Sequence, residues 1–361
     1  MAARDPPRAP QGEAGYRAGA RRGASAMTNA AFYQGRRVMI TGGLGFIGSN
    51  LAHRLAGLGA DVLLVDSLIP DYGGNLFNIS GIESRVRVNV ADVRQASTMN
   101  YLVQDREVIF NLAGQVSHID SMRDPHTDLE INCRSQLTLL EACRHHNPKA
   151  KVVYASTRQI YGRPDALPVT ERQLVRPTDV NGVNKAAGEY YHLVYNNVFG
   201  VRACALRLTN VYGPRQLLRH NRQGFIGWFI RLVLEDREIE VFGDGSQVRD
   251  FVYVDDAVEA FLAAGASDAV NGEAFNVGGD EHITHRDLVA LLVELAGRGR
   301  YKFIDWPAEK KAIDIGSFYA DSSLFMTRTG WAPTVPLREG FTRTLDYYRE
   351  HLAKYVDERP V

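Results

Sequence analysis

The sequence predicts an α/β fold, in which a doubly wound parallel sheet is followed by a smaller C-terminal α/β lobe. From residue 36 onward, short continuous apolar runs alternate with longer amphipathic stretches. Continuous apolar runs are typical of strands buried on both faces, and amphipathic stretches are typical of the helices that cover them. After residue 210 this alternation gives way to glycine-rich turns between short elements, which predicts the separate lobe.

The expected strands of the sheet are, in order, RRVMIT, ADVLLVD, RVRVNV, EVIFNLA, KVVYAS and VRACALRL. Helices are expected between them, with one ending at Leu58 and others at about 126–146 and 181–198.

We therefore expect a first domain at 36–210 and a lobe at 211–361 that partly returns to it. Residues 1–35 are predicted to be disordered, because their first part is rich in Arg, Ala, Gly and Pro and has no periodic apolar face. Met27 is a candidate start of the protein.

Charge and composition narrow the class of partner. The 42 basic and 42 acidic residues balance, which gives no electrostatic reason to expect nucleic acid or a membrane surface. No apolar run approaches the roughly 20 residues that a membrane-spanning helix needs. Cys133, Cys143 and Cys204 form no CxxC pair and are odd in number. They predict reduced thiols in a cytoplasmic protein, with neither disulfides nor a metal site.

A glycine-rich loop, GGLGFIG, connects the first expected strand to the first expected helix. The GxxGxxG spacing allows a tight turn and a close approach of the backbone to a pyrophosphate at the helix N-terminus. An ordinary strand-to-helix turn is the alternative for this loop taken alone. The flanking strand, the helix and a downstream acidic residue favour a Rossmann-type dinucleotide site. Its loop residues are Gly42, Gly45, Phe46, Ile47 and Gly48.

The downstream acidic residue is Asp66, which closes the second expected strand 18 residues after Gly48. A carboxylate at this place accepts hydrogen bonds from both hydroxyls of the adenosine ribose and repels a 2′-phosphate. No arginine immediately follows Asp66 to hold such a phosphate. The expected cofactor is therefore NAD and not NADP.

Motifs spread over about residues 36–350 resemble the extended short-chain dehydrogenase/reductases, specifically the nucleotide-sugar epimerases and dehydratases. In order, they are TGGLGFIGSNL, VADVR, FNLAGQVSHIDS, YASTRQIYG, VNKAAGE, RLTNVYGPRQ, VFGDGSQVRDFVYVDD and FNVGG. Several spaced matches in the right order make this resemblance highly specific. It implies NAD as the cofactor and a nucleotide-diphosphate sugar as the substrate.

The resemblance also implies roles for residues beyond the glycine loop. Asp92 and Val93 should line the adenine pocket, and Lys185 should bond the nicotinamide ribose. The residues expected to pass beneath the cofactor are Leu112, Ala113 and Gly114.

On the substrate side, the resemblance implies that Asn210 contacts the sugar nucleotide. Val241 and Phe242 match the edge strand that pairs with the nucleobase. Arg249 matches the arginine that relatives place on the diphosphate, a role that suits a permanent, planar cation. A surface salt bridge to Asp250 is the alternative for Arg249.

The chain departs from its relatives at Asn181, four residues before Lys185, where they carry a tyrosine. In relatives that tyrosine accepts the proton of a sugar hydroxyl, and an asparagine amide cannot do this. Thr157 matches the Ser or Thr that hydrogen-bonds the reacting oxygen. Three hypotheses stay open for the base: Lys185 with a lowered pKa, His118 from a neighbouring loop, or a loss or change of the redox chemistry.

Arg158 and Gln159 stand where dehydratases of the family carry an Asp-Glu pair, so water elimination lacks its acid and base. Related decarboxylases usually carry Glu at the position of Gln159. The motifs look most like the branch that contains CDP-tyvelose 2-epimerase, alongside UDP-glucose 4-epimerase. We expect an NAD-dependent epimerase that acts through a transient keto sugar. The alternatives are a dehydratase or decarboxylase, and a non-catalytic protein that binds NAD or a sugar nucleotide.

Relatives dimerise through two helices that form a four-helix bundle, and 126–146 and 181–199 are the candidates here. The second stretch contains KAAGEYYHLVYNNVF, with more apolar and aromatic residues than one sheet face requires. We therefore expect a homodimer. The alternative is that both helices pack only on the sheet.

Overall fold

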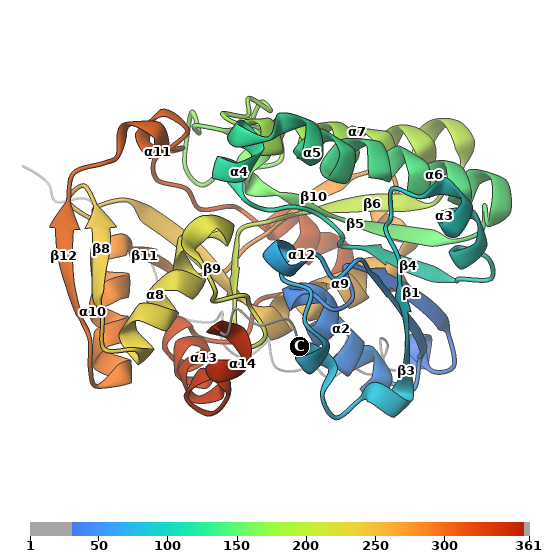
Figure 1. The fold of residues 1–361 in the computed structure, drawn as a ribbon. Helices are drawn as coiled ribbons and strands as arrows, with labels where there is room; N and C mark the ends of the chain where they lie inside the picture. Colours follow the sequence, from blue (N-terminus) through green and yellow to red (C-terminus); the bar gives the residue numbers. More distant parts are fainter. Residues whose placement is uncertain (1–30, 357–361) are drawn as a thin grey trace, which may run out of the picture.

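The computed structural model describes residues 31–356, and its centre is a seven-stranded parallel sheet (Figure 1). The strand order is β10-β6-β5-β4-β1-β2-β3. The bounds are β1 Arg37–Thr41, β2 Asp61–Asp66, β3 Val86–Val90, β4 Val108–Asn111, β5 Lys151–Thr157, β6 Ala203–Leu208 and β10 Ala274–Val277. The predicted α/β class and doubly wound sheet are confirmed.

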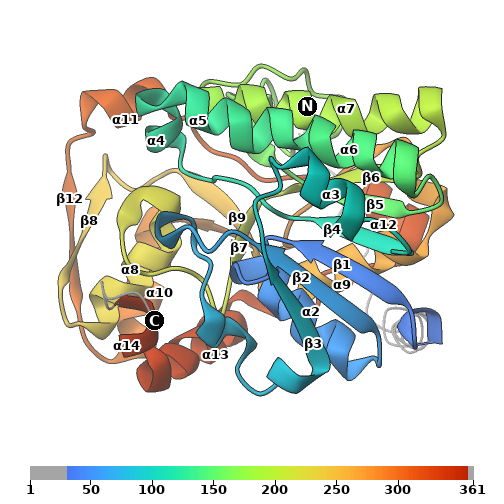
Figure 2. The same cartoon turned by 45° about the vertical axis from the view of Figure 1, so that its right-hand side comes forward.

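Helices cover both faces of this sheet, as the two views in Figures 1 and 2 show. One face carries α3 Ala96–Leu102, α4 His118–Arg123, α5 Pro125–Leu129, α6 Ser135–His146 and α7 Val180–Phe199. The other face carries α2 Phe46–Gly57, α9 Val254–Ala266 and α12 Ser323–Thr329. The buried strand positions form a core on each side, which explains why the strands read as continuous apolar runs.

Smaller sheets and helices build the second part of the molecule. β8 Glu238–Phe242 pairs with β12 Arg300–Ile304, while β9 Val248–Tyr253 lies between β7 Asn210–Tyr212 and β11 His282–Thr284. The helices are α8 Phe225–Leu234, α10 His285–Ala296, α11 Ala308–Ala312, α13 Leu337–His351 and α14 Ala353–Val356. Short 3-10 turns are η1 Pro70–Tyr72, η2 Leu76–Ile79, η3 Glu83–Arg85, η5 Arg158–Tyr161, η6 Asn221–Gln223 and η7 Asp268–Val270.

The register of the parallel strands brings distant segments to one edge of the sheet. Thr41 at the end of β1 pairs with Val65 of β2 and with Asn111 of β4. Thr157 at the end of β5 pairs with Leu208 of β6. The loops that follow these strands therefore emerge together, which is the usual place of a ligand site in such folds.

Two expectations need correction. The disorder predicted for 1–35 falls mostly outside the described residues, but 31–35 are folded, because the Tyr33 ring is fully buried and its hydroxyl donates to the Leu262 carbonyl at 2.8 Å. The helix predicted at about 126–146 is present but irregular. A π-helical turn, η4 Glu130–Arg134, separates α5 from α6.

Among residues 31–356, no helix combines the length and the apolar character that crossing a membrane requires.

Candidate functional site

The glycine loop forms a close-packed turn between β1 and α2. Gly42 has a φ of +66°, and a Cβ there would come within 2.9 Å of the Ala113 backbone nitrogen. A Cβ on Gly48 would collide with the Gly42 carbonyl oxygen, because the start of α2 packs directly on the turn. Side chains larger than hydrogen are therefore excluded at both positions. The loop keeps its backbone close to the space above it, as pyrophosphate binding requires.

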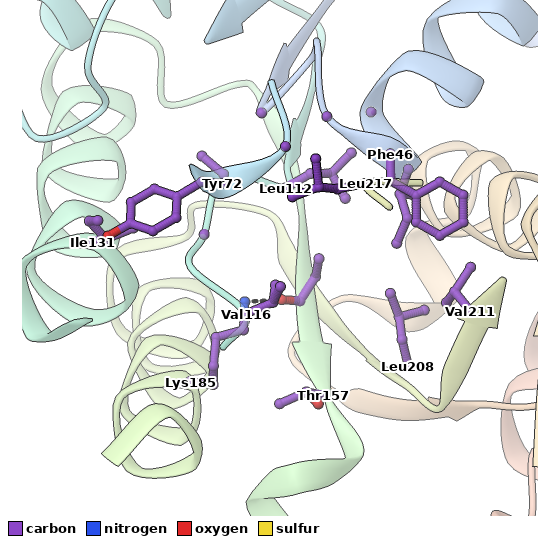
Figure 3. Close-up of a pocket in the computed structure, with 18 of the residues that line it drawn as sticks. Phe46, Tyr72, Leu112, Val116, Ile131, Thr157, Lys185, Leu208, Val211 and Leu217 are labelled. Atoms are coloured by element: carbon purple, nitrogen blue, oxygen red, sulfur yellow. Dashed lines mark hydrogen bonds between the residues drawn. The ribbon is translucent and has the colours of Figure 1, made fainter. Parts of the chain in front are cut away.

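A cavity of about 410 Å³ opens above this loop, at the carboxyl edge of the sheet (Figure 3). The structure brings every residue predicted to bind the cofactor, from segments far apart in the sequence, into its lining. These are Gly42, Gly45, Phe46, Ile47, Gly48, Asp66, Asp92, Val93, Leu112, Ala113, Gly114 and Lys185.

Asp66 is fixed at the cavity wall by two backbone amides. Its Oδ2 accepts from Leu44 N at 3.0 Å, and its Oδ1 accepts from Leu68 N at 2.9 Å. Burial raises the pKa of this carboxyl, although the two amide donors oppose the shift. Each oxygen keeps a lone pair for a further donor, so the carboxylate fits the two ribose hydroxyls of NAD.

Asp92 forms an ion pair with Arg94 at the lining of the same cavity. Its carboxylate accepts from the guanidinium of Arg94 at 2.5 Å, and this hydrogen bond lowers the pKa of Asp92. Arg94 is therefore neutralised by Asp92. It does not supply the free cation that a 2′-phosphate would need.

Lys185 reaches from α7 toward the end of β5, near Thr157 (Figure 3). Its Nζ donates to the Ala155 carbonyl at 2.6 Å and lies 4.6 Å from the centre of the Tyr154 ring. Burial lowers the pKa of Lys185 to about 8, while the nearby charges of Asp128 and Glu189 oppose the shift. At neutral pH this amine is a cation that points into the cofactor cavity.

Asn181 lines the same cavity, but its amide nitrogen is turned toward buried acceptors. Nδ2 donates to the Gln115 carbonyl at 2.8 Å and to Asp128 Oδ2 at 3.1 Å. Asn132 and Asn184 donate to the same Asp128 carboxylate. In the structure Asn181 therefore ties α7 to the buried Asp128 carboxylate.

Thr157 and His118 also line the cavity. The Thr157 hydroxyl accepts from Gln159 N at 3.2 Å and so begins the turn η5. Nδ1 of His118, on α4, lies 3.1 Å from Oδ2 of Asp179. The Asp179 carboxylate was not singled out from the sequence. Its place just before the expected helix was the available signal, because Asp is a favoured N-cap residue.

A second cavity, of about 840 Å³, adjoins the first and contains Val241, Phe242 and Arg249 in its lining. Val241 is buried, and β8 pairs only with β12 among the described residues, so the other edge of β8 has no strand partner there. The rings of Phe242 and Trp306 lie 5.2 Å apart, and the Lys310 ammonium lies 4.7 Å from the Phe242 ring. The sequence reasoning missed Trp306 and Lys310.

The alternative prediction for Arg249, a surface salt bridge to Asp250, is wrong. Arg249 is buried, and its guanidinium donates to the Gly316 carbonyl at 2.5 Å and lies 3.8 Å from Asp314. The Asp250 carboxylate instead accepts from Ala320 N at 3.2 Å, because successive residues of β9 face opposite sides.

Asn210, also predicted on the substrate side, lines the first cavity and not the second. Its Oδ1 accepts from Arg158 at 3.0 Å, and its Nδ2 donates to the Asp250 carbonyl at 2.8 Å. Arg158 lines both cavities and adds a partly buried cation next to Arg249, which the sequence reasoning did not assign. The amide of Asn210 therefore positions Arg158 at the boundary between the two cavities.

No group of His, Cys, Asp or Glu side chains in the described part of the chain could hold a metal ion. The three cysteines are buried and free. The first cavity is lined by the hydroxyl of Thr157, the amine of Lys185, the imidazole of His118 and the guanidinium of Arg158.

Fold and site define a dinucleotide-binding α/β protein with a second ligand cavity beside the first. The profile of the family described as NAD dependent epimerase/dehydratase family matches residues 38–278, and the chain belongs to this family. The predicted family membership is thus confirmed, and the family is NAD-dependent.

Named relatives cover nearly the whole chain. A UDP-glucose 4-epimerase of Mycolicibacterium smegmatis is 33% identical over 314 residues, which cover 87% of this chain and 98% of the relative. A CDP-paratose 2-epimerase of Salmonella typhi is 29% identical over 339 residues, 86% of this chain and 98% of the relative. Dehydratases are also among the matches.

Solved structures agree with this assignment. The Thermus thermophilus UDP-glucose 4-epimerase in complex with NAD has a TM-score of 0.78 and 32% identity, covering 87% of this chain and 99% of the other.

Proposed function

We propose that this protein is an NAD-dependent nucleotide-sugar epimerase that acts through a transient keto sugar, with Asn181 in place of the usual tyrosine. The observation that most supports this function is that the two cavities adjoin and share lining residues. The first fits a dinucleotide, and the second offers an open strand edge and the cation of Arg249. A sugar joined to a nucleoside diphosphate in the second cavity would reach Thr157 and Lys185 in the first.

In this proposal, residues 36–210 mainly hold the cofactor and the later lobe mainly holds the nucleotide. The glycine loop receives the pyrophosphate, Asp66 receives the adenosine ribose, and Lys185 receives the nicotinamide ribose. Thr157 donates a hydrogen bond to the reacting oxygen. Bound NAD would take a hydride from a sugar carbon and return it, so that no net oxidant is consumed.

Epimerisation is favoured over elimination because the site lacks an acid pair beside Thr157. Arg158 is bound to Asn210, and the Gln159 amide donates to Asp179 at 2.7 Å. Neither side chain can protonate a leaving hydroxyl. The relatives named as 4-epimerase and 2-epimerase support the same reaction class.

The test is a panel of UDP-, CDP- and dTDP-hexoses, incubated with the full-length protein and NAD and followed by proton NMR. We expect a second nucleotide sugar of unchanged mass from at least one of them. A product lighter by one water, or release of carbon dioxide, would instead establish a dehydratase or decarboxylase. A Gly48→Val variant, whose side chain would collide with Gly42, is the control that lacks the cofactor.

A non-catalytic role is the second candidate, because the Asn181 amide is engaged by Asp128. It predicts that the wild-type protein binds NAD and turns over no sugar. Activity that emerges only in Asn181→Tyr would then mark a dormant site.

We further propose a homodimer formed through α6 and α7. One face of α7 carries exposed apolar side chains at helical spacing. They are Val183, Tyr190, Val194 and Val198, whose exposed fractions are 53%, 48%, 48% and 66%. Such a stripe on an otherwise sheet-packed helix supports a partner copy.

The double substitution Val194→Glu and Val198→Glu is expected to make the protein monomeric in light scattering after gel filtration. The two charges would be buried without partners in the interface. Leu76→Glu, an exposed apolar position outside α6 and α7, is the matched control and should leave the dimer intact. A wild-type monomer, or a double variant that still dimerises, would contradict this interface.

A further inference from the structure

We propose that His118 accepts the proton of the reacting sugar hydroxyl and that Asp179 is its positioning residue. This inference rests on the proposed function, because it supplies the proton acceptor that Asn181 cannot be. It assigns a catalytic role to a residue on α4 and a positioning role to the N-cap of α7.

His118 lies where the sugar must react. The residues that line both cavities mark the passage between them, which a sugar reaching from the second cavity into the first must cross, and they are His118, Arg158, Gln159, Gly224 and Phe225. Among them the imidazole is the one side chain that can act as a general base, since guanidinium, amide and phenyl groups and glycine cannot. About a third of the His118 side chain, 36%, is exposed, so a ligand in the cavity can reach it.

Asp179 is fixed in place beside the His118 imidazole. Its side chain is fully buried at the N-cap of α7, where Oδ1 accepts from Gly182 N at 2.7 Å. Oδ2 accepts from the Gln159 amide at 2.7 Å and lies 3.1 Å from Nδ1 of His118. Burial alone would raise the pKa of Asp179, but His118 and these donors together lower it, so the carboxylate is ionised.

An ionised carboxylate beside Nδ1 selects the tautomer with the proton on Nδ1 and leaves Nε2 as the acceptor. In the described part of the chain, Nε2 has no hydrogen-bond partner. Nδ1 lies within hydrogen-bond distance of Oδ2 but makes no hydrogen bond in the structure, so the ring must reorient for Nδ1 to donate to the carboxylate. Catalytic contacts of this kind commonly tighten when substrate binds.

Lys185 is less suited to the same step. Its Nζ donates to the Ala155 carbonyl, and with a pKa lowered by burial to about 8 it is mostly protonated at pH 7. It can therefore hold the cofactor ribose as a cation while His118 takes the proton. The two residues approach the site from different helices, α7 and α4.

The sugar hydroxyl gives its O–H proton to Nε2 of His118, and its carbon gives a hydride to oxidised NAD, so that C–OH becomes C=O. When the hydride returns to the opposite face of the carbonyl carbon, the imidazolium returns its proton to the oxygen. Asp179 stabilises the imidazolium that exists between the two events.

The first test compares His118→Ala and His118→Gln with the wild type. We expect kcat to fall by about 10²–10⁴-fold with KM and bound NAD little changed. Added imidazole should restore part of the turnover of His118→Ala. His126→Ala, at an exposed histidine on α5 that lines neither cavity, is the matched control and should keep wild-type turnover. Near-wild-type turnover in both His118 variants would overturn the proposal.

The second test addresses Asp179 through Asp179→Asn, because asparagine is an equally good N-cap and preserves the start of α7. We expect kcat to fall by at least about 10-fold with unchanged KM and NAD content. Nitrogen-15 NMR of labelled histidines provides a readout without turnover: the wild type should carry the His118 proton on Nδ1, and Asp179→Asn should lose this preference. An Nε2–H tautomer in the wild type would overturn the positioning role.

These outcomes distinguish a failure of the proposed function from a failure of the role proposed for His118. If the wild-type protein converts no nucleotide sugar, the proposed function fails, whereas the NMR result still tests the pairing of His118 with Asp179. If the wild type makes epimers and the His118 variants do so equally fast, the function stands and this inference fails.

Discussion

Replacing Lys185 by methionine is expected to lower the rate of epimerisation by about 10²–10³-fold and, at the same time, to stabilise the cofactor-free protein. The activity falls because the cation that faces the cofactor cavity is lost. The stability rises because burial of Lys185 lowers its pKa from 10.5 to about 8, which corresponds to roughly 3 kcal/mol of disfavoured protonation at neutral pH. The lost hydrogen bond to the Ala155 carbonyl offsets part of this gain. We therefore expect the free energy of unfolding, measured with urea, to rise by about 1–2 kcal/mol.

The stability that Lys185→Met gains over the wild type should decrease as the pH rises. Between pH 8 and 10.5 the folded wild type binds fewer protons than the unfolded chain, so its stability rises with pH in this window. The advantage of Lys185→Met is therefore largest below pH 8 and shrinks above it. Lys151→Met, at a buried lysine that lines neither cavity, is the control that should keep wild-type turnover. A Lys185→Met protein that is less stable than the wild type at pH 7 would contradict this account of the site.

Replacing Arg207 by methionine is expected to destabilise the fold by about 3–5 kcal/mol, measured by urea unfolding. The Arg207 guanidinium on β6 is bound by Glu189 of α7 at 2.6 Å and donates to the Tyr161 hydroxyl at 2.7 Å. Ser156 of β5 donates to the same Glu189 carboxylate at 2.6 Å. All four side chains are buried, so removing the cation leaves a carboxylate without its charge partner.

The control is the double substitution Arg207→Met and Glu189→Met, which removes both charges. Replacement of a whole buried ion pair by apolar side chains of similar size costs less than removal of one partner. The double variant should therefore be more stable than Arg207→Met alone. If the single variant loses less than about 1 kcal/mol, the network does not carry the stability ascribed to it here.

The strands and the glycine loop could be predicted because each rests on a local pattern. Continuous apolar runs followed from burial on both faces, and the spacing of Gly42, Gly45 and Gly48 followed from a turn that excludes side chains. The break at η4 had no such signal, since the residues around it are compatible with a regular helix. In the structure the break accompanies Asn132, whose amide bonds the Gln115 carbonyl at 2.8 Å and Asp128 at 3.0 Å.

Contacts between distant segments account for what the sequence did not reveal. His118 was recognised as a candidate base, but Asp179 lies 61 positions away and meets it only when α4 packs against the start of α7. The same holds for Arg249, whose neighbour Asp314 comes from a loop 65 positions later. The departure predicted at Asn181 rests on motif spacing, while the bond from Asn181 to Asp128 could be seen only in the folded chain.

Native mass spectrometry of the full-length protein tests the central claim most directly. The spectrum would be recorded as purified and then with added NAD or NADP, followed by denaturation to identify the small molecules released. We expect one NAD per protomer, little binding of NADP, and a further mass shift with a nucleotide-diphosphate sugar. A protein that shows no mass shift with NAD would contradict the redox function built on the glycine loop, Asp66 and Lys185.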